Sequence, residues 1–419
     1  MRIALVHNRY RSNMPSGENR VVDTEAEALA AAGHQVSRFE KHNDEIDQWS
    51  WARKASLPAR VLWSQQTYRD LSAALRADRP DVVHVHNTFP LLSPAVLQAC
   101  RAAAVPAVTT IHNYRLACAS GIFFRDGAVC HECAHRRPAP AVQHGCYRDS
   151  RIASVPAALA VSVHRPAWKS LVSAYIFISA AQRDLLAGVR FPPDRVFVRH
   201  NLIPRRDVPK TARTRTVIYA GRLAEVKGVR LLMAAWDQYL ERAGRDGLRL
   251  VVAGAGPLQA EVAAWAAGRP SVELAGEVTS RRCAELIAAA RAILVPSTWE
   301  ETFGLVVVEG MAVGTPAIAA GHGSLAELIS PGTDGVLFRP GDPAALAAAI
   351  ADAAAHPEQY ETYGDQARKT YAHRFDPERS LEHLLDIYRF AIAHPVRHPA
   401  GPLASHLPSH LGRSDGGNP

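Results

Sequence analysis

Several features that would assign this 419-residue chain to other protein classes are missing. No apolar run approaches the roughly 20 residues of a membrane span, and the apolar stretch in the opening MRIALVHN is too short for a signal peptide. The mid-chain GAG at Gly254 and Gly256 has Gln259 where a dinucleotide-binding fingerprint would place its third glycine. The six cysteines come without an export signal, which indicates reduced thiols. We therefore expect a cytoplasmic enzyme, and a dehydrogenase is disfavoured.

Lysine is scarce, with six lysines against 42 arginines, and the charge is unevenly spread. Residues 1–205 carry 26 basic against 16 acidic side chains, a net of +10, whereas residues 206–419 carry 22 against 24, a net of −2. A basic first half suits an anionic membrane surface or a phosphorylated acceptor. Solvated faces of an arginine-rich composition would give the same balance. We expect no nucleic-acid partner, because no nucleic-acid-binding motif accompanies the charge.

Short β-branched strands alternate with helical segments along the chain. The expected strands of the first half are RIALVHN, QVSRFE, DVVHVHN, AVTTIHN, SAYIFIS and VFVRHN, and those of the second half are TVIYAGR, LRLVVAG, VELAGE, AILVPS and PAIAAG. Apolar strands separated by helices are typical of parallel sheets with helices on both faces. The predicted fold class is α/β, with two Rossmann-like doubly wound parallel-sheet domains facing across a cleft.

The alternation begins afresh near residue 216, after the Pro- and charge-rich segment PRRDVPKTARTRT. We expect an N-terminal domain at 1–205 and a C-terminal domain at 206–379. A last helix, SLEHLLDIYRFAIAH at 380–394, comes after the second sheet is complete. The tail at 395–419 is rich in Pro, Gly and Ser and is expected to be disordered.

Two cations follow the first strand of the second half, in YAGRLAEVKGV. Arg222 comes directly after the strand, and Lys227 lies five residues later. At the carboxyl edge of a parallel sheet, an arginine fork and a lysine point charge can together neutralise a diphosphate. Solvated charges on an ordinary strand-to-helix loop are the alternative.

Two glutamates bracket a glycine-containing loop in STWEETFGLVVVEG. Gly304 lets the backbone approach a ligand closely. The N–H groups of Phe303, Gly304 and Leu305 would point outward at a helix start, which favours an anion. Glu309 can then accept the hydroxyls of a ribose, and Glu301 can accept sugar hydroxyls on the other side of the phosphates. Either glutamate taken alone is more often a solvated residue.

The pattern G-R-L-x₃-K-G, then G-x-G-P, then E-x-F-G-L-x₃-E-G-M-A-x-G-x-P resembles the retaining glycosyltransferases of family 4, which have the GT-B fold. The resemblance covers residues 1–394, and Thr302 stands where many members have glycine. It implies that a sugar moves from a nucleotide-diphosphate sugar, with retention of configuration, to a glycan, glycolipid or small-molecule acceptor. It also implies no catalytic metal, which agrees with the absence of an Asp-x-Asp pair from the sequence.

The resemblance gives the second-half candidates their roles. Arg222 and Lys227 would hold the donor diphosphate and stabilise the leaving group, and the loop backbone would touch phosphate. Glu309 would bind ribose, and the backbone at Glu277 and Val278 would pack against the base. The final helix would cross back onto the first domain.

Polar residues also follow strands of the first half. Gly17 begins a helix and can let the donor phosphates approach a second helix terminus, as in the family's glycine-rich first loop, although Ser16 replaces a second glycine. By resemblance, His112 would sit beside the transferred sugar and the acceptor. His84 is predicted to be a satisfied core histidine. The acceptor-side candidates are His86, Asn87, Asn113 and Arg115.

Four cysteines fall within 29 residues, spaced C-x₁₁-C-x₂-C-x₁₂-C. They are Cys118, Cys130, Cys133 and Cys146. With reduced thiols, this spacing predicts a tetrahedral structural Zn²⁺ site, and free thiols or disulfides are the alternatives. His131, His135 or His144 could replace a cysteine, and a hairpin is expected to turn at Asp126 and Gly127. A subgroup of the family looks similar here, with H-N-Y-R before the cysteines, and we interpret the insertion as shaping the acceptor pocket.

The apolar segment at 150–172, SRIASVPAALAVSVHRPAWKSLV, carries Arg, Lys and Trp at its ends. Such a helix could touch a membrane interface, and a core-facing helix is the alternative. Two other functions remain open. A GT-B sugar-nucleotide epimerase would epimerise a free sugar nucleotide without an acceptor, and a non-catalytic nucleotide-sugar-binding protein would bind the donor without turnover.

Overall fold

The computed structural model describes residues 1–12, 16–135, 138–208, 212–243 and 247–396. The middle of the expected linker, at 209–211, and nearly all of the expected disordered tail, from 397 on, lie outside the described residues. Within the described parts, no helix is long and apolar enough to cross a membrane.

The N-terminal sheet has six parallel strands in the order β2-β1-β3-β4-β7-β8. The strands are β1 (Arg2–Arg9), β2 (Gln35–His42), β3 (Val82–Asn87), β4 (Ala107–Ile111), β7 (Ala174–Phe177) and β8 (Val196–Val198). The helices between them are α1 (Gly17–Ala31), α2 (Trp51–Ala55), α3 (Leu57–Leu62), α4 (Gln65–Asp78), α5 (Ala95–Ala102), α6 (Ala139–Gln143), α7 (Arg151–Leu171) and α8 (Ala180–Leu185). β3, β4 and β7 are buried throughout, as expected for strands covered on both faces.

The C-terminal sheet repeats this plan, with six parallel strands in the order β11-β10-β9-β12-β13-β14. The strands are β9 (Thr216–Ala220), β10 (Arg249–Ala253), β11 (Val272–Gly276), β12 (Ala292–Val295), β13 (Ala317–Ala320) and β14 (Gly335–Phe338). Its helices are α9 (Val229–Ala243), α10 (Gln259–Ala266), α11 (Ser280–Ala289), α12 (Leu305–Val313), α13 (Gly323–Leu328), α14 (Pro343–Ala355) and α15 (Pro357–Arg374). The prediction of two doubly wound domains is confirmed, and β14 is an additional strand.

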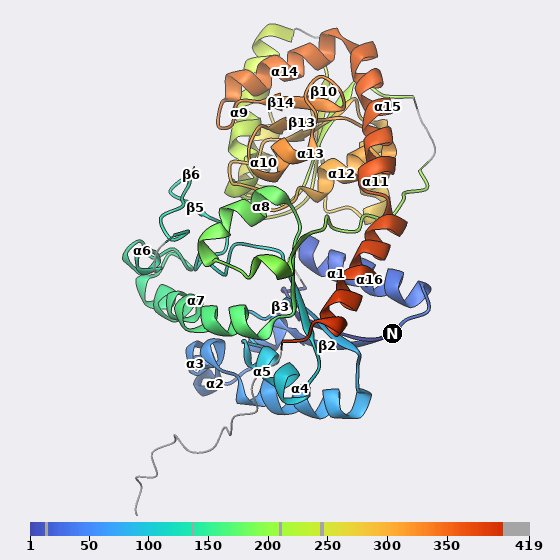
Figure 1. The fold of residues 1–419 in the computed structure, drawn as a ribbon. Coiled ribbons are helices and arrows are strands. Elements are labelled where there is room, and N and C mark those ends of the chain that lie inside the picture. The colour runs from blue at the N-terminus through green and yellow to red at the C-terminus, as the bar shows by residue number, and fades with distance from the viewer. Residues whose placement is uncertain (13–15, 136–137, 209–211, 244–246, 397–419) are drawn as a thin grey trace, which may run out of the picture.

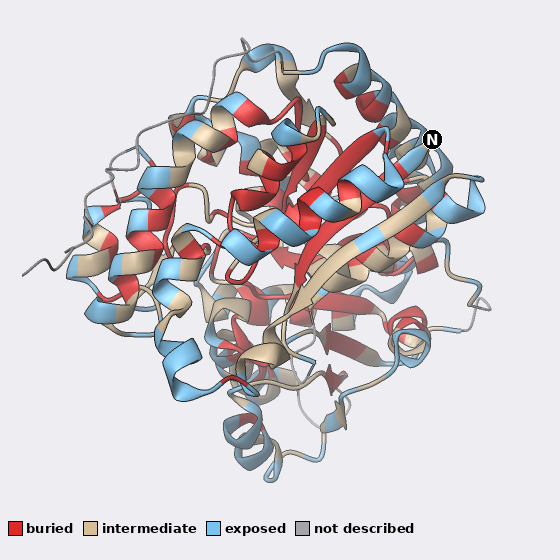
Figure 2. Cartoon of the chain, turned by 90° about the horizontal axis from the view of Figure 1, so that it is seen from below, coloured by how far each residue is buried: buried red, intermediate tan, exposed pale blue. Residues whose placement is uncertain are grey.

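The last helix, α16 (Pro377–Ala393), leaves the C-terminal domain and packs against the N-terminal sheet (Figure 1). Its Leu384, Ile387 and Tyr388 are buried in one cluster with Ile3 and Leu5 of β1. The opposite face of the N-terminal sheet has a second apolar cluster, and the C-terminal domain has its own. Figure 2 shows this distribution, with buried residues concentrated in the strands and exposed residues on the outer helices.

The cysteine-containing insertion adds a short antiparallel hairpin, β5 (Phe124–Arg125) and β6 (Ala128–Val129). Asp126 and Gly127 both have positive φ, 52° and 76°, which is the geometry of a two-residue hairpin turn. The predicted turn is therefore confirmed.

Candidate active site

A lysine and a glutamate meet at the carboxyl ends of two neighbouring strands of the C-terminal sheet. Lys227 follows β9, Glu301 follows β12, and their Nζ and Oε1 atoms are 2.6 Å apart. Ser297 also donates a hydrogen bond of 2.7 Å to the same oxygen. A Cβ on Gly228 would lie 1.7 Å from the carbonyl oxygen of Pro296, so only glycine lets the lysine loop come this close to the end of β12.

Glu301 is buried, yet it is held as a carboxylate. Burial raises its pKa, but the charge of Lys227 and the hydrogen bonds from Lys227 and Ser297 more than offset that effect, so the pKa lies below its usual value. Lys227 also lies 5.3 Å from the ring centroid of Trp299, so the ammonium faces an aromatic surface as well. The lysine therefore stands as a fixed cation beside a fixed anion.

The loop at 297–304 is clamped by side chains that bind its carbonyl oxygens. Ser324 donates to the carbonyls of Glu301 and Phe303, both at 2.8 Å. From the N-terminal domain, Ser179 donates to the carbonyl of Thr302 at 2.8 Å, and Tyr114 donates to that of residue 300 at 3.1 Å. With its carbonyls bound in this way, the loop meets both domains.

The cysteine-containing insertion reaches the same loop. Its His131 Nε2 lies 2.5 Å from Oε2 of Glu300, and Glu225 Oε1 lies 3.9 Å from the place a Cβ on Gly127 would occupy. The insertion therefore touches the loops that carry Lys227 and Glu301.

Two helix N-termini meet at the junction of the domains. α1 begins at Gly17 and α12 begins after Gly304, whose φ of 93° is left-handed and favours glycine. A Cβ on Gly17 would lie 2.7 Å from a methyl group of Leu305. Because the first N–H groups of a helix have no partners within the helix, this junction is suited to an anion. The side chain of Phe303 points into the core and packs near His200, which leaves its backbone at the junction.

The expected ribose acid, Glu309, is paired with arginines. Its Oε1 lies 3.0 Å from Arg20 of α1 and 3.8 Å from Arg206 of the segment that joins the domains. These arginines were not among the predicted site residues. Because Arg20 belongs to the N-terminal domain and Arg206 to the joining segment, the Glu309 carboxylate links the two domains.

Arg222 is exposed and makes no side-chain hydrogen bond or ion pair among the described residues. The loop of Arg222 packs closely against the GAG turn. A Cβ on Gly254 would clash with the carbonyl oxygen of Gly221, and a Cβ on Gly256 would clash with that of Leu223. The glycines of that turn therefore serve loop packing. The guanidinium of Arg222 remains available to a ligand, and the structure does not bring it into direct contact with Glu301.

Glu277 and Val278, which follow β11, are exposed and half-buried respectively, and Val278 packs against the core of the C-terminal domain. Within the part of the chain that the structure describes, no hydrogen bond or ion pair joins either of them to the Lys227 loop. They lie beyond β10 in the sheet order, at the outer edge of the site.

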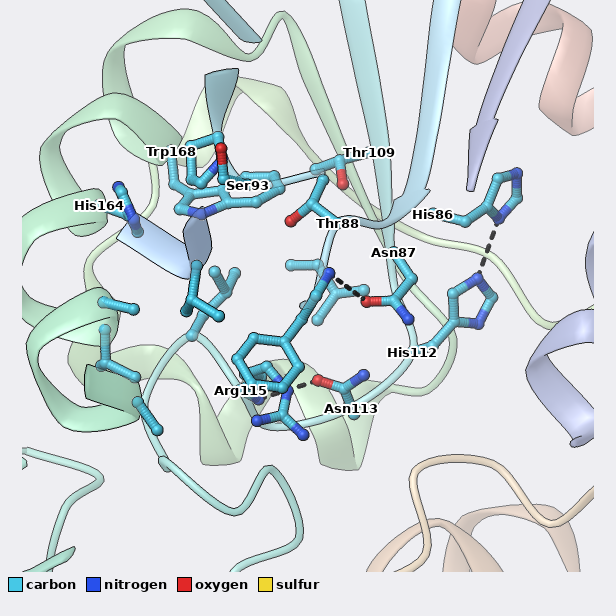
Figure 3. Close-up of a pocket in the computed structure, with 18 of the residues that line it drawn as sticks. His86, Asn87, Thr88, Ser93, Thr109, His112, Asn113, Arg115, His164 and Trp168 are labelled. Atoms are coloured by element: carbon cyan, nitrogen blue, oxygen red, sulfur yellow. Dashed lines mark hydrogen bonds between the residues drawn. The ribbon is translucent and has the colours of Figure 1, made fainter. Parts of the chain in front are cut away.

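A cavity in the N-terminal domain contains all the acceptor-side candidates (Figure 3). It encloses roughly 740 Å³ including its open mouth. The predicted residues that line it are His86, Asn87, His112, Asn113 and Arg115. The remaining wall is largely apolar and comes from α3, α7 and the loops after β3 and β4.

Two of these side chains are committed to local structure. Asn87 donates to the carbonyl of Asn8 at 2.9 Å and accepts from the N–H of Phe89 at 3.0 Å. Arg115 donates to the carbonyl of Ala119 at 2.8 Å and lies 4.0 Å from the ring centroid of Phe89. Both residues therefore shape the wall of the cavity.

His112 is held from behind by a buried polar chain. His86 Nδ1 and His112 Nε2 are 3.0 Å apart, and Figure 3 shows the other nitrogen of His112 pointing away from His86. His86 Nε2 lies 3.7 Å from Glu25 of α1, whose other oxygen accepts from Arg199 at 2.6 Å. His84 is bonded at 2.8 Å by both Tyr388 and Thr110, so the prediction of a satisfied core histidine is confirmed.

These histidines are neutral. Burial lowers the pKa of His112 to about 3 and places those of His84 and His86 well below the usual value. The neighbouring charge of Arg199 lowers them further, and that of Glu25 raises the pKa values of His84 and His112. At 3.7 Å, His86 Nε2 makes no hydrogen bond with Glu25, so the hydrogen bond that fixes the His112 ring is the one to His86 Nδ1. Because the ring of His112 is neutral, only one of its two nitrogens carries a proton.

Among the described residues, Glu25, His84 and His86 are the only three whose possible metal-binding atoms all lie within 4.8 Å of one another. Arg199 already neutralises Glu25, and both nitrogens of His84 have partners. A cation would have to displace these contacts, so this cluster is suited to positioning His112 and not to holding a metal.

The four clustered cysteines are free thiols that line one small cavity with Phe123 and Arg125. Burial, and then the proximity of the Cys118 sulfur, raises the pKa values of Cys133 and Cys146. The sulfurs are farther apart than in a closed zinc site, because no three of them lie mutually within 4.8 Å. The four cysteines thus line one cavity, but their sulfurs do not form a closed tetrahedron.

Glu18 is a further site residue that the sequence did not reveal. Tyr10 donates to its Oε2 at 3.2 Å, while its Oε1 is buried without a hydrogen-bond partner among the described residues. Burial raises the pKa of this carboxyl to about 7, against the lowering effect of Tyr10, Arg115 and Asn113. It lies directly after Gly17, so this carboxyl stands in the first turn of α1, at the junction of the domains.

Two parallel-sheet domains that meet at their strand carboxyl ends, with cations and two helix N-termini at the junction, define the GT-B class. Residues 15–206 match the family model for glycosyltransferase family 4, and residues 214–356 match the model for glycosyl transferases group 1. The chain belongs to these glycosyltransferases.

Known proteins resemble the chain over nearly its whole length. An uncharacterised glycosyltransferase of Methanocaldococcus jannaschii is 23% identical over 424 residues, which cover 94% of this chain and 99% of the relative. A glycogen synthase of Mycobacterium tuberculosis is 27% identical over 414 residues, covering 90% and 91%. The crystal structure of Anabaena HepE in complex with UDP and glucose superposes with a TM-score of 0.67 at 17% identity, covering 92% of this chain and 98% of HepE. At this identity, the similarity to HepE shows a shared fold only.

Proposed function

We propose that the enzyme transfers a sugar from a nucleotide-diphosphate sugar to a hydroxyl of a glycan, lipid-linked or small-molecule acceptor, with retention of configuration. The observation that carries the proposal is the Lys227–Glu301 pair, 2.6 Å apart beside the two helix N-termini at the domain junction. A fixed cation beside backbone N–H groups at helix starts supports the binding of a diphosphate at this junction.

Departure of the diphosphate is the step that these residues assist. Negative charge grows on the phosphate oxygens as the bond to the sugar breaks, and Lys227 together with the exposed Arg222 would stabilise it. Glu301, an anion next to Lys227, would accept sugar hydroxyls and keep the lysine oriented. The backbone N–H groups of Gly304 and Leu305, with the terminus at Gly17, would hold the phosphates. The acceptor oxygen would form its bond to the anomeric carbon as the bond to the diphosphate breaks, and the proton of the acceptor hydroxyl would pass to the departing diphosphate, with no covalent enzyme intermediate.

On the other side of the sugar, His112 would position a hydroxyl group. Its pKa of about 3 keeps the ring neutral, so it serves as a hydrogen-bonding group and not as a proton source. The acceptor would occupy the cavity bounded by His86, Asn113 and Arg115. The UDP and glucose bound to HepE support a UDP-sugar as the first donor to examine.

Binding of the donor tests the function. UDP-, GDP- and ADP-sugars should be compared by thermal shift, since a ligand specific for the folded state raises the melting temperature by mass action. One nucleotide series should raise it, and anomeric analysis of the product formed with an acceptor should then give the configuration of the donor. If none of the nucleotide sugars binds, the proposal fails.

Glu309→Ala should weaken binding of the free nucleoside diphosphate by about 10- to 100-fold, because two charge-assisted hydrogen bonds to ribose are lost. Calorimetric titration of both proteins measures the change. Glu273→Ala is the matched control, since Glu273 is an exposed glutamate of β11 in the same domain. Unchanged affinity in Glu309→Ala would exclude the ribose role.

Arg20→Ala refines that experiment. If Arg20 competes with ribose for Glu309, its removal should leave nucleotide affinity equal or higher. A loss as large as that of Glu309→Ala would instead mean that the ion pair itself builds the site.

We also propose that Cys118, Cys130, Cys133 and Cys146 hold one structural Zn²⁺. Four thiols around one cavity are the donor set that zinc prefers, and small movements of their side chains would close the tetrahedron. The ion would crosslink the insertion, whose His131 contacts the loop of Glu301 through Glu300. It would have no part in the chemistry.

The purified protein should contain about one zinc per chain, measured by plasma mass spectrometry under reducing conditions. Cys133→Ser should lower the metal content, whereas Cys100→Ala, at an isolated buried cysteine, should not. A fully reduced, folded protein without zinc, even after incubation with the metal, would contradict the proposal.

We place the enzyme in the cytoplasm, with peripheral contact to an anionic membrane. The net charge of +10 in residues 1–205 supports the contact with an anionic membrane.

A further inference from the structure

One face of α7 is apolar, exposed and unpartnered. Ile152, Val155, Leu159 and Val163 are 86%, 49%, 45% and 54% exposed. Their spacing of three, four and four residues puts them on one side of the helix. No charged residue occurs between Arg151 and Arg165. Water therefore meets a continuous apolar stripe along three turns, which is unusual for a surface helix.

The opposite face of the same helix lines the acceptor cavity. Ala157, Val161 and Trp168 project into the cavity wall from α7, where Val61 of α3 joins them. Figure 3 shows Trp168 and His164 on one side of this space and His112 and Asn113 on the other. The cavity therefore extends from His112 to the seam between α7 and α3.

The surroundings of the stripe are aromatic and basic. α2 contacts α3, and α3 contacts α7, so the three helices form one corner of the domain (Figure 1). Trp51 of α2 is 82% exposed, and Trp63 directly after α3 is also exposed. The three helices carry six basic side chains and no acidic one. The basic residues are Arg53, Lys54, Arg60, Arg151, Arg165 and Lys169.

We propose that this corner docks on an anionic membrane surface and that the acceptor is lipid-linked. Exposed Trp, an apolar stripe and basic neighbours are the features of helices that lie in the membrane interface. The stripe would enter the lipid, the cations would bind the headgroups, and the lipid part of the acceptor would follow the apolar wall from the seam of α3 and α7. Its polar head would then reach His112. This inference rests on the proposed transfer reaction and specifies its acceptor class.

Vesicle flotation tests the surface. The full chain should float with vesicles of phosphatidylglycerol and phosphatidylcholine in equal parts, and much less with phosphatidylcholine alone or at high salt. Leu159→Glu combined with Val163→Glu should lower the bound fraction by about tenfold. Leu274→Glu is the matched control, because Leu274 of β11 is 43% exposed, close to the value for Leu159. It should bind like the unaltered protein.

Arg53→Glu with Lys54→Glu provides a second variant, which leaves the stripe intact and should also weaken flotation. The thermal shift caused by the sugar nucleotide should be unchanged in every variant, which shows that the proteins are folded and that the donor site is intact. No flotation of the unaltered protein, equal flotation with zwitterionic vesicles, or full binding by the stripe variant would overturn the docking surface.

The acceptor class is tested with the same proteins. Transfer from labelled donor into the organic-soluble fraction of a membrane extract should exceed transfer into its water-soluble fraction, and the stripe variant should lose it only when the extract is presented in vesicles. Product confined to the water-soluble fraction would overturn the lipid-linked acceptor while leaving sugar transfer established. Absence of donor binding would instead count against the proposed function itself.

Discussion

Lys227→Ala should lower kcat by about 10²- to 10³-fold, the range measured when a preorganised group that stabilises developing charge is removed. The ammonium is fixed by Glu301 at 2.6 Å, and Glu301 belongs to the loop that leads into the N-terminus of α12, where the diphosphate would lie. Steady-state kinetics with the best donor measures the effect, and KM should change less than kcat. Arg222→Ala should act in the same direction through the same leaving group.

A structural loss must be separated from a catalytic one, because Lys227→Ala also leaves the buried Glu301 carboxylate without its cation. Glu301→Gln and the double variant Lys227→Met with Glu301→Gln remove that complication. If Lys227 acts on the diphosphate, the double variant should be about 10²-fold slower than Glu301→Gln alone. Equal rates would mean that Lys227 serves only to neutralise Glu301.

Arg230→Ala is the matched control for both cations. Arg230 lies three residues beyond Lys227, is exposed, and pairs with Glu261 at 2.8 Å away from the junction. Its rate should stay near that of the unaltered enzyme, since a surface ion pair contributes little. A loss comparable to that of Lys227→Ala would point to general disturbance of α9.

The fold was accessible from the sequence because both sheets are built of buried apolar strands. Runs such as VVHVHN and AILV alternate with helices, and that alternation defines doubly wound domains. β14 was missed because its residues GVLF lie between SPGTD and RPGD, two segments typical of turns. Its length was not the reason, since β12 and β13 are equally short and were predicted.

The site was less accessible because its contacts are not local. Lys227 and Glu301 were predicted separately, one for the diphosphate and one for sugar hydroxyls, and their direct pairing depends on β9 lying next to β12 in the sheet. Arg20 and Glu25 belong to a helix with acidic and basic residues on several faces. In such a sequence, a charged residue that will be buried cannot be distinguished from one that faces solvent. Glu25 gains its partners only in the folded protein, where α1 meets Arg199 after β8 and the histidines of β3.

The buried histidine cluster predicts a strong loss of stability in mild acid. His84, His86 and His112 have folded-state pKa values below the unfolded value of about 6.5, because burial disfavours their charged forms. Below that pH the unfolded chain binds protons that the folded chain does not, so the free energy of unfolding falls as pH falls. Each histidine should cost about 2 kcal/mol between about pH 6.5 and pH 5, or about 6 kcal/mol for the three.

Glu25 does not mask this effect. Its folded-state pKa lies below the usual value, because Arg199 and the histidines outweigh the cost of burial, so the carboxylate is ionised in both states throughout this window. Its own contribution is lost only in stronger acid, as the pH falls through its folded pKa. Glu18 acts in the opposite direction, because its pKa of about 7 lets the folded chain bind a proton in this window that the unfolded chain does not. The net slope between about pH 5 and 6.5 is therefore the loss from the three histidines, reduced by the gain from Glu18.

Urea midpoints measured from about pH 7.5 down to pH 5 would reveal the slope. His86→Gln should reduce it by about one histidine's share, while His356→Gln, on the exposed end of α14, should leave it unchanged. The same slope in His86→Gln as in the unaltered protein would mean that the cluster takes up protons in the folded protein as readily as in the unfolded chain. His112 would then be a possible proton donor, and its role as a neutral hydrogen-bonding group beside the transferred sugar would have to be abandoned.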